Sequence, residues 1–396
     1  GRLDPATGVF TEWTIPTAGS TPWGIYVSGG YVYFTEAGGN KIGRLDPSTG
    51  IFTEWTIPTA TSYPEGIYVS GGYVYFTEYV GNKIGRLDPS TGVFTEWTIP
   101  TASSQSEGIY VSGGYVYFTE YTGYKIGRLD PATGIFTEWT IPAAGPGPIG
   151  IYVSGGYVYF TELDANKIGR LDPSTGVFTE WTIPTAGSGP WHIYVLDSVI
   201  YFTENWGNKI GRLDPATGVF TEWTIPTANS RPRGIYVSGG YVYFTEYNSN
   251  KIGRLDPSTG ILKEWIIYAT SYSYPVGIHV YGGYVYFTEA IGNNIGRLAV
   301  SPVSTVTTFV SKTFSHVTTV SAVSTASGTY FSTTMVMSST SSTTSVSVST
   351  TSYTTSISDW VTVEPPPPWA AVPTGTTDAS PAIGYFYERL YCAVKG

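Results

Sequence analysis

The sequence predicts an all-β protein folded as a seven-bladed β-propeller, in which each blade is a four-stranded antiparallel sheet. Three observations lead to this fold class. A Gly-Arg-Leu motif returns every 42 residues, each repeat holds four β-type runs, and aromatic residues (16%) outnumber charged ones (12%). Near-identical units of about 40 residues with four strands each are typical of propeller blades. The motif begins at Gly1, Gly43, Gly85, Gly127, Gly169, Gly211 and Gly253, and an eighth copy begins at Gly296.

Each repeat contains four runs of β-branched and aromatic residues, separated by Gly, Pro and Asp clusters that indicate turns. The runs of one unit cover residues 24–27, 31–36 and 41–45, and the outermost type covers 9–16. The breaks are a Ser-Gly-Gly turn at 28–30, a variable loop at 37–40, an Asp-Pro-Ser-Thr-Gly turn at 46–50 and a proline-bearing loop at 17–23. We therefore expect an up-and-down antiparallel blade in every repeat.

The order of the strand types indicates how the ring closes. The first run, at residues 8–16, is of the outermost type, and the last, at 293–298, is of the third type. Pairing these two segments completes a seventh blade and leaves no open sheet edge at the joint. Because the motif at Gly1 duplicates the one at Gly296, an eighth blade that includes residues upstream of Gly1 is an alternative. The count of strand types favours seven blades.

The composition changes after the last repeat, which divides the chain into three expected parts. Residues 1–298 form the propeller, and residues 299–363 form a Ser/Thr-rich stalk. Within 301–360, 35 of 60 residues are Ser or Thr, and near-alternate apolar residues predict that the stalk is partly β-structured. Residues 364–396 are a Pro-rich spacer and a short C-terminal segment, with polyproline II structure at 365–368 and a short helix beginning at Ser380.

The stalk resembles the O-glycosylated stalks of secreted and surface proteins, and this implies an extracellular or cell-surface location. The net charge of −9 and the pI near 4.9 argue against nucleic acid as a partner. The sequence has no run of 18 apolar residues, so we expect no membrane span in this chain.

The repeat carries Phe-Thr-Glu, Asn-Lys-Ile-Gly-Arg and Glu-Trp-Thr-Ile-Pro elements, and with these it resembles the streptogramin (virginiamycin B) lyase family over residues 1–298. The resemblance implies a seven-bladed propeller. It also implies a lyase that opens a cyclic depsipeptide by elimination, with a histidine base and a magnesium ion held by glutamates and a histidine. The active histidines of the family stand just before the Gly-Ile that opens the innermost strand.

None of the positions before Gly-Ile holds a histidine in this sequence. His192 stands one position later, where it replaces the glycine, and His279 replaces a strand tyrosine equivalent to Tyr26. Elimination needs a well-placed base, so we expect no catalytic residues and favour structural roles for both histidines. The seven positions hold Trp23, Glu65, Glu107, Ile149, Trp191, Arg233 and Val276.

The repeats differ from one another mainly in two loops, the one before the first strand (17–23 and its equivalents) and the one after the second strand (37–40 and its equivalents). Both loops fall at the same end of an up-and-down blade, so the variation is confined to one face. A rigid scaffold with variable loops at one end is how binding surfaces are commonly built. The ligand-binding candidates on this face are Trp23, Glu65, Glu107, Trp191, His192, Trp206, Arg233 and Tyr247.

A glutamate ends the second strand of every repeat. Seven such carboxylates facing one channel would repel each other unless they are paired or bridged by a cation. We expect each to pair with a basic residue of its own blade, as Glu36 could with Lys41 or Arg44, and a divalent-cation ring is the alternative. The ring is Glu36, Glu78, Glu120, Glu162, Glu204, Glu246 and Glu289.

The sequence thus favours a secreted or cell-surface propeller that acts as a binding or structural module for an extracellular glycan or protein, with no cofactor other than that cation. Self-association through residues 300–360 would make it an assembly subunit. The alternative is a streptogramin-lyase-like C–O lyase that uses a divalent metal with His192, His279 and the glutamate ring.

Overall fold

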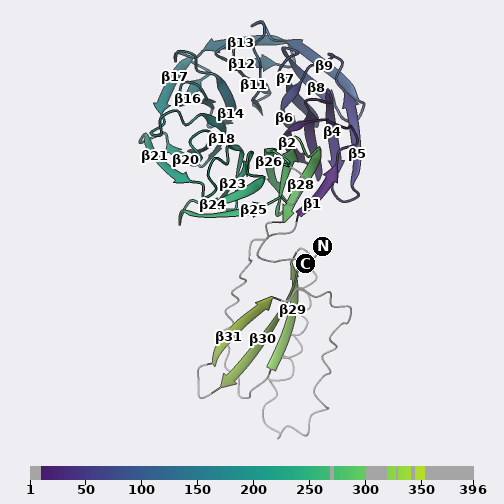
Figure 1. Ribbon diagram of the computed structural model, residues 1–396, viewed down its shortest axis with the longest axis vertical. Helices are drawn as coiled ribbons and strands as arrows, with labels where there is room; N and C mark the ends of the chain where they lie inside the picture. Colours follow the sequence, from purple (N-terminus) through teal and green to yellow (C-terminus); the bar gives the residue numbers. More distant parts are fainter. Residues whose placement is uncertain (1–9, 268–271, 300–318, 327–328, 340–343, 353–396) are drawn as a thin grey trace, which may run out of the picture. The chain divides into compact units, whose positions relative to one another are not determined.

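The computed structural model describes residues 10–267, 272–299, 319–326, 329–339 and 344–352. The chain forms two compact units, one of residues 6–302 and one of residues 1–5 and 303–396, and each is described by itself. The first unit consists of seven four-stranded antiparallel sheets, which Figure 1 shows arranged as a ring. The predicted seven-bladed propeller is confirmed.

The four strand types recur once per blade. The innermost strands are β2 (Pro22–Ser28), β6 (Pro64–Ser70), β10 (Ile109–Ser112), β14 (Pro148–Ser154), β18 (Pro190–Leu196), β22 (Pro232–Ser238) and β26 (Pro275–Tyr281). The second strands are β3 (Tyr31–Glu36), β7 (Tyr73–Glu78), β11 (Tyr115–Glu120), β15 (Tyr157–Glu162), β19 (Val199–Glu204), β23 (Tyr241–Glu246) and β27 (Tyr284–Glu289). The third strands are β4 (Lys41–Asp46), β8 (Lys83–Asp88), β12 (Lys125–Asp130), β16 (Lys167–Asp172), β20 (Lys209–Asp214), β24 (Lys251–Asp256) and β28 (Asn294–Ala299). The outermost strands are β5 (Ile51–Thr56), β9 (Val93–Thr98), β13 (Ile135–Thr140), β17 (Val177–Thr182), β21 (Val219–Thr224), β25 (Ile261–Ile266) and β1 (Phe10–Thr14).

The ring closes by pairing of the two ends of the propeller sequence. Strand β1 lies antiparallel to β28, with Phe10 opposite Leu298 and Thr14 opposite Asn294. The seventh blade is therefore β26, β27, β28 and β1, and blades 1 to 6 begin at β2, β6, β10, β14, β18 and β22. The closure expected from the order of strand types is correct.

Buried threonines hold each blade to the next. The Thr35 hydroxyl accepts a hydrogen bond from the Gly24 amide at 2.9 Å and donates one to the Glu65 carbonyl of blade 2 at 2.8 Å. The same contact occurs at all seven joints, and in the last one Thr288 donates to the carbonyl of Trp23 at 2.7 Å. We call this ring of interactions the threonine latch.

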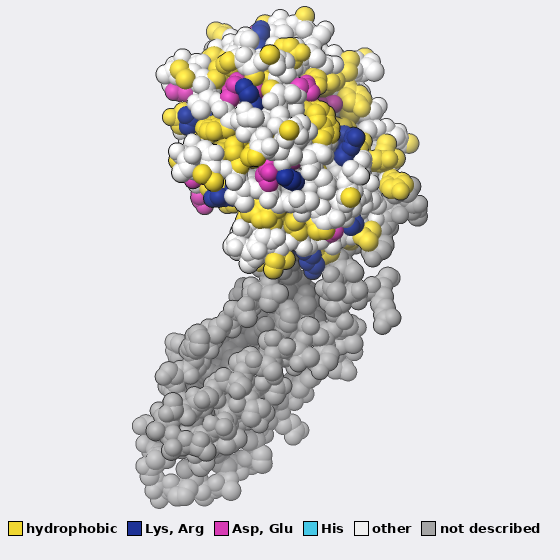
Figure 2. All heavy atoms as spheres, turned by 60° about the vertical axis from the view of Figure 1, so that its left-hand side comes forward, with side chains coloured by type: hydrophobic (Ala, Val, Ile, Leu, Met, Phe, Trp, Pro, Cys, Tyr) yellow, Lys and Arg dark blue, Asp and Glu magenta, His cyan; other side chains and the backbone are white. Residues whose placement is uncertain are grey.

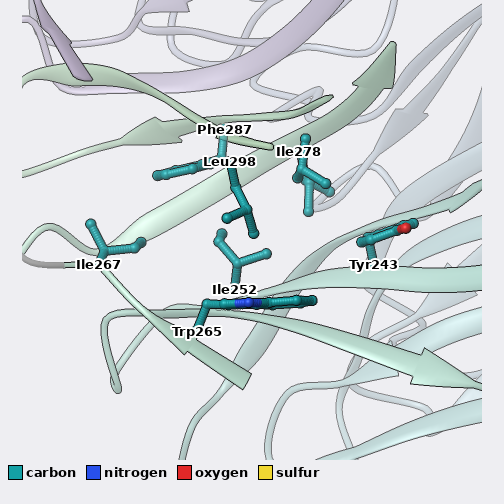
Figure 3. Close-up of a cluster of buried hydrophobic side chains, with 8 residues drawn as sticks. Tyr243, Ile252, Trp265, Ile267, Ile278, Phe287 and Leu298 are labelled. Carbon is teal, nitrogen blue, oxygen red and sulfur yellow. The ribbon is translucent and has the colours of Figure 1, made fainter. Parts of the chain in front are cut away.

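Apolar side chains fill the space between neighbouring blades. Figure 3 shows one such cluster, in which Ile252 and Trp265 of blade 6 pack toward Phe287 and Leu298 of blade 7. The strand glycines are needed here, because a Cβ added at Gly296 would lie 2.1 Å from the Phe287 ring. The glycine of Gly-Arg-Leu is thus retained in every blade to make room for a fully buried phenylalanine.

Seven aromatic side chains, one from each blade, form a circle around the central channel. Successive members have ring centroids 4.5 to 4.9 Å apart, and His279 closes the circle between Tyr236 and Tyr26. The structure places His279 as a packed member of this circle, with its Nδ1 atom buried and without a hydrogen-bond partner. The circle is Tyr26, Tyr68, Tyr110, Tyr152, Tyr194, Tyr236 and His279.

The second unit contains a separate antiparallel sheet of β29 (Thr319–Ala326), β30 (Thr329–Ser339) and β31 (Thr344–Ser352). The predicted polyproline run at 365–368 and the helix from Ser380 lie outside the described residues, as does the whole of 300–318. Association of the stalk with a propeller therefore stays a prediction. In the described parts of the chain, no helix has the length and apolar character needed to cross a membrane.

Candidate functional site

The two variable loops of each blade lie together at one end of the propeller, as the repeat comparison predicted. In blade 1 the Ala37 and Gly38 amides donate to the carbonyls of Thr21 and Ser20, at 3.2 and 2.9 Å. Asn40 joins this pair of loops to blade 2, because its Oδ1 accepts from the Ser62 amide at 2.7 Å. The variable face is thus a hydrogen-bonded rim on a rigid sheet scaffold.

A β-bulge positions the residue before Gly-Ile at the mouth of the channel. The pairing of the first and second strands shifts register between Pro64 and Ile67 in blade 2, and equivalent shifts occur in every blade except blade 3. A bulge re-aims the side chain that it contains. The threonine latch binds the backbone carbonyl of this residue, so its side chain is left available for other contacts.

Arg233 lies among three aromatic rings of the channel mouth. Its guanidinium carbon is 3.6 Å from the ring centroid of Tyr247, 4.6 Å from that of Trp191 and 5.1 Å from that of Trp23. Trp191 belongs to blade 5 and Trp23 to blade 1, so this cation–π cluster joins parts of the ring that are far apart in the sequence. The structure brings together four of the eight predicted ligand-binding residues in this cluster.

Two buried carboxyl groups belong to blades 2 and 3. Glu65 and Glu107 are only 5% and 6% exposed. Burial raises the pKa of Glu107 to about 7, although the charge of Arg233 and the indole groups of Trp23 and Trp191 act in the opposite direction. Burial and the charge of Glu107 raise the pKa of Glu65 well above its usual range. Near neutral pH this pair therefore carries less than two negative charges.

His192 completes the predicted set at the channel. Its backbone amide donates to the latch hydroxyl of Thr203 at 3.1 Å, which is the contact that the replaced glycine makes in other blades. Burial, followed by the positive charge of Arg233, lowers the pKa of the His192 imidazole to about 4. The imidazole is therefore neutral at physiological pH.

Two cavities, each of about 180 Å³, open at this end of the molecule. The channel cavity is lined by Trp23, Glu65, Glu107 and His192 above the Gly-Ile-Tyr strands. The side cavity is lined by Tyr79, Glu107, Tyr121, Ile149, Leu163 and Trp191. Glu107 is the residue that the two lining sets share.

The structure does not bring all of the predicted ligand-binding residues together. Trp206 is 51% exposed and packs on Gly189, outside the cluster and both cavities. Tyr79 and Tyr121 line the side cavity but were not among the predicted site residues. They follow the strand-ending glutamate of their blades, as Tyr247 does, so this shared position was the signal that could have identified them.

The expected pairing of Glu36 with Lys41 or Arg44 is wrong. Lys41 binds the outermost-strand residue Glu54 instead, at 3.0 Å, and Arg44 lies over the rings of Tyr31 and Trp55. Equivalent Lys–Glu pairs occur in six blades, at 2.6 to 3.3 Å. Figure 2 shows such basic and acidic groups side by side on an otherwise weakly charged surface.

The strand-ending glutamates are fully buried inside their own blades. Burial, and then the charge of Glu54, raise the pKa of Glu36 to about 8, and the counterparts of Glu36 have values raised to about 7 or 8. These carboxyl groups are therefore mainly protonated at neutral pH and poorly suited to bind a cation.

The magnesium ion implied by the family resemblance does not fit the residues present. Across the described parts of the chain, no three His, Cys, Asp or Glu side chains are grouped so that they could hold a metal ion. The acidic groups at the channel mouth are Glu65 and Glu107, and the positive charge of Arg233 acts on both. A fixed guanidinium in this place disfavours a second cation.

Comparisons with known proteins identify relatives of the propeller. The model of the virginiamycin B lyase family matches residues 1–130 and 91–313. The structure of virginiamycin B lyase from Staphylococcus aureus is 35% identical, with a TM-score of 0.70, and the match covers 74% of this chain and 99% of that chain. No curated protein matches the sequence significantly.

Two further solved structures give the same result. A catalytically inactive histidine-to-alanine variant of the Staphylococcus aureus lyase, solved with quinupristin, is 35% identical with a TM-score of 0.70, and the match covers 74% of this chain and 99% of that one. A streptogramin B lyase structure is 34% identical with a TM-score of 0.70, and the match covers 74% of this chain and 98% of that chain.

Proposed function

This chain belongs to the virginiamycin B lyase family, and from that premise we propose that it acts as a ligand-binding propeller rather than as a lyase. The ligand would be an extracellular glycan or protein segment bound on the variable face. The observation that carries this proposal is the convergence of Trp23, Trp191, Tyr247 and Arg233 beside two cavities. Aromatic rings with a few buried polar groups in a concave site are typical of binding pockets.

The histidines supply the argument against catalysis. His279 is packed between two tyrosines, and burial lowers its pKa to about 4. The pKa of His192 is also lowered to about 4. An imidazole this weakly basic is a poor match for proton abstraction near neutral pH.

Binding is tested by isothermal titration with glycans and peptides. Trp23→Ala and Trp191→Ala should each weaken binding by ~1–3 kcal/mol, the usual cost of removing an aromatic anchor. Trp206→Ala makes the same substitution on the same face outside the cluster, and Ser70→Ala lies in a turn at the opposite end; both should leave binding unchanged. Equal losses in all four variants would contradict the assignment.

A C–O lyase is the second candidate, because one group of the site has a suitable acidity. Glu107, with a pKa of about 7, lines the same cavity as His192 and has an oxygen without a hydrogen-bond partner. Quinupristin, the compound bound in the Staphylococcus aureus variant, is the natural probe. Elimination opens its ring without a change of mass, so chromatography would report the reaction, whereas hydrolysis adds one water.

We expect quinupristin to stay intact with and without magnesium. Ring opening that is lost in Glu107→Gln or His192→Ala would establish the lyase and overturn the binding-only proposal. Tight quinupristin binding without turnover would instead support the proposal and identify a peptide ligand.

We also propose that the protein is displayed outside the cell and associates through residues 300–360. The support is the Ser/Thr-rich composition of that segment and its scarcity of charge, which offers little repulsion between copies. A chain ending at Leu298 retains every strand of the closed ring, with only Ala299 of β28 removed, and should fold, but should lose higher-order association in sedimentation experiments. An unchanged oligomeric state, together with rapid proteolysis throughout 300–360, would contradict the association.

A further inference from the structure

We propose that the side cavity is an aromatic cage for a trimethylammonium group, carried by an Nε-trimethylated lysine of a protein ligand. This inference rests on the proposed function and names the ligand chemistry at one part of the same face. It is carried by the residues that line the side cavity, by the charges beside it and by the few hydrogen-bond acceptors that it offers.

Three aromatic side chains line the side cavity, and they come from separate blades. Tyr79 follows strand β7 of blade 2, Tyr121 follows β11 of blade 3, and Trp191 belongs to β18 of blade 5. Apart from one carboxyl group, the remaining lining is aliphatic, and its residues Ile149 and Leu163 are 2% and 5% exposed. Aromatic rings attract cations, and aromatic cages are a known means of recognising methylated ammonium groups. The lining therefore has the composition of a cage for an organic cation.

The charged side chain in the lining is acidic. Glu107 supplies the one carboxyl group of the lining set, and none of the ion pairs formed by the described residues includes it. Its Oε1 atom has no hydrogen-bond partner, and its pKa of about 7 leaves the group ionised in mildly alkaline solution. A second carboxylate adjoins the wall, since Asp164 accepts a hydrogen bond from the Tyr121 hydroxyl at 3.1 Å. A buried carboxylate without a partner is costly, so a cation in the cavity would supply what Glu107 lacks.

The positive charge of Arg233 acts on Glu107, but Arg233 does not line the side cavity. Its guanidinium carbon lies 4.6 Å from the ring centroid of Trp191. When Glu107 and Asp164 are both ionised, their two negative charges exceed this one positive charge. Phosphocholine would bring a phosphate that both carboxylates repel. The charges therefore favour a ligand whose only charge near the cavity is the ammonium, as in trimethyllysine.

The scarcity of hydrogen-bond acceptors distinguishes a methylated from an unmodified lysine. An unmodified ammonium brings three N–H donors, and a donor that leaves water without finding a partner is costly. The side chains of Ile149 and Leu163 offer no acceptor, and the Tyr121 hydroxyl is already engaged with Asp164. A trimethylammonium group has no N–H donor and presents methyl groups to the rings. The cavity volume of about 180 Å³, the space of about six water molecules, is sufficient for this group.

The test compares three peptides that differ at a single side chain. Isothermal titration of the full chain at pH 8.5, where Glu107 is ionised, uses acetyl-Gly-Ala-Lys-Ala-Gly-amide with the lysine trimethylated. The same peptide with unmodified lysine, and a neutral version in which carbon replaces the ammonium nitrogen of trimethyllysine, are the comparisons. The trimethylated peptide should bind at least about tenfold more tightly than either, as expected for a cation–π contact in a partly desolvated site.

Substitutions in the cavity wall locate the preference. Tyr79→Leu keeps an apolar side chain but removes the aromatic ring, and it should weaken binding of the trimethylated peptide at least about fivefold, whereas Tyr79→Phe should retain it. Glu107→Gln removes the charge, keeps the shape and should reduce the advantage over the neutral peptide. Trp206→Leu is the matched control, since Trp206 is an exposed aromatic residue of the same face outside the cavity lining, and it should change nothing.

Several outcomes would overturn the cage. One is equal binding of the trimethylated peptide and either comparison, and another is a preference that survives in both Tyr79→Leu and Glu107→Gln, with folding checked by circular dichroism. Phosphocholine bound more tightly than the trimethylated peptide would overturn the assignment to lysine. Failure of all three peptides, while other glycans or peptides bind in a manner that depends on Trp23, would overturn the cage and leave the proposed binding function standing. Failure across every glycan and peptide would reject both.

Discussion

At the scale of single residues, the strand-ending glutamates show how burial changes the chemistry of a side chain. Glu36 lies opposite Lys41 in the strand register, yet Lys41 turns to Glu54. Glu36 is fully buried, whereas the side chains of Lys41 and Glu54 keep 25% and 15% of their exposure. A lysine retains more hydration by pairing near the surface, and the inner carboxyl group avoids charge by keeping its proton.

Glu36→Gln tests this interpretation. Glutamine resembles the protonated acid but cannot ionise, so the variant should be as stable as the wild type at pH 5 and more stable at pH 9, where the wild type must deprotonate a buried group. Thermal unfolding at the two pH values measures the difference. Glu54→Gln, which breaks the Lys41 pair, is the control and should destabilise at both. A Glu36→Gln variant that is less stable at pH 9 would show that the buried group is ionised and paired.

At the scale of elements, the repeat was sufficient to predict nearly every strand. Residues 31–36 were predicted and observed as a strand, and β2 extends the predicted 24–27 to Pro22–Ser28. The extension reflects the β-bulge, since Pro22 pairs with Glu36 across it, and propensity does not reveal such an irregularity. Blade number and ring closure followed from periodicity because identical units bury identical faces.

The candidate site was less predictable from the sequence. The variable loops and Arg233 could be identified by comparing repeats, but Trp23, Trp191 and Arg233 meet only because the ring brings distant blades around one axis. The contact of Arg233 with aromatic rings, and not with Glu65 or Glu107, depends on side-chain packing across the channel. Local patterns carry no information about that packing.

The threonine latch gives a test at the element scale. Thr35→Val keeps the shape of the side chain but leaves the Gly24 amide and the Glu65 carbonyl without this partner, which should cost ~1–3 kcal/mol in unfolding free energy. Urea denaturation measures the loss. Thr56→Val, at the exposed end of β5, is the matched control and should change stability by less than ~0.5 kcal/mol. Equal losses of unfolding free energy in the two variants would show that the latch stabilises the propeller no more than an exposed threonine does.

At the scale of the whole molecule, the seven buried glutamates act together on stability. Their pKa values are raised to about 7 or 8 in the folded state, against an ordinary value of 4.5. For a raised pKa, the stabilisation is complete below the unfolded value and is lost as pH rises through the folded value. The aspartates of the Asp-Pro turns, such as Asp46, have lowered pKa values through hydrogen bonds to the turn and lose their contribution when pH falls below about 4.

The propeller should therefore be most stable in mildly acidic solution, near pH 4 to 5 on these grounds, and its melting temperature should fall between pH 5 and pH 8. If each glutamate contributes only ~1 kcal/mol, the fall is on the order of 10 °C. Calorimetry of the full chain across this range measures it. A melting temperature that is constant or rising between pH 5 and pH 8 would contradict the prediction that the folded propeller binds more protons than the unfolded chain in this range.

The threonine latch also has a consequence for how the sequence of such a protein can evolve. Each joint is held through the carbonyl of the residue before Gly-Ile, a group that every amino acid has, so the ring does not constrain which side chain stands there. The chain shows this freedom, since tryptophan, glutamate, isoleucine, arginine and valine all occupy that position. The mouth of the channel thus has seven positions whose side chains vary on a backbone scaffold that stays the same. Duplicated blades could diverge by single substitutions at these positions. A catalytic histidine could be acquired or lost in this way while every intermediate sequence still folds.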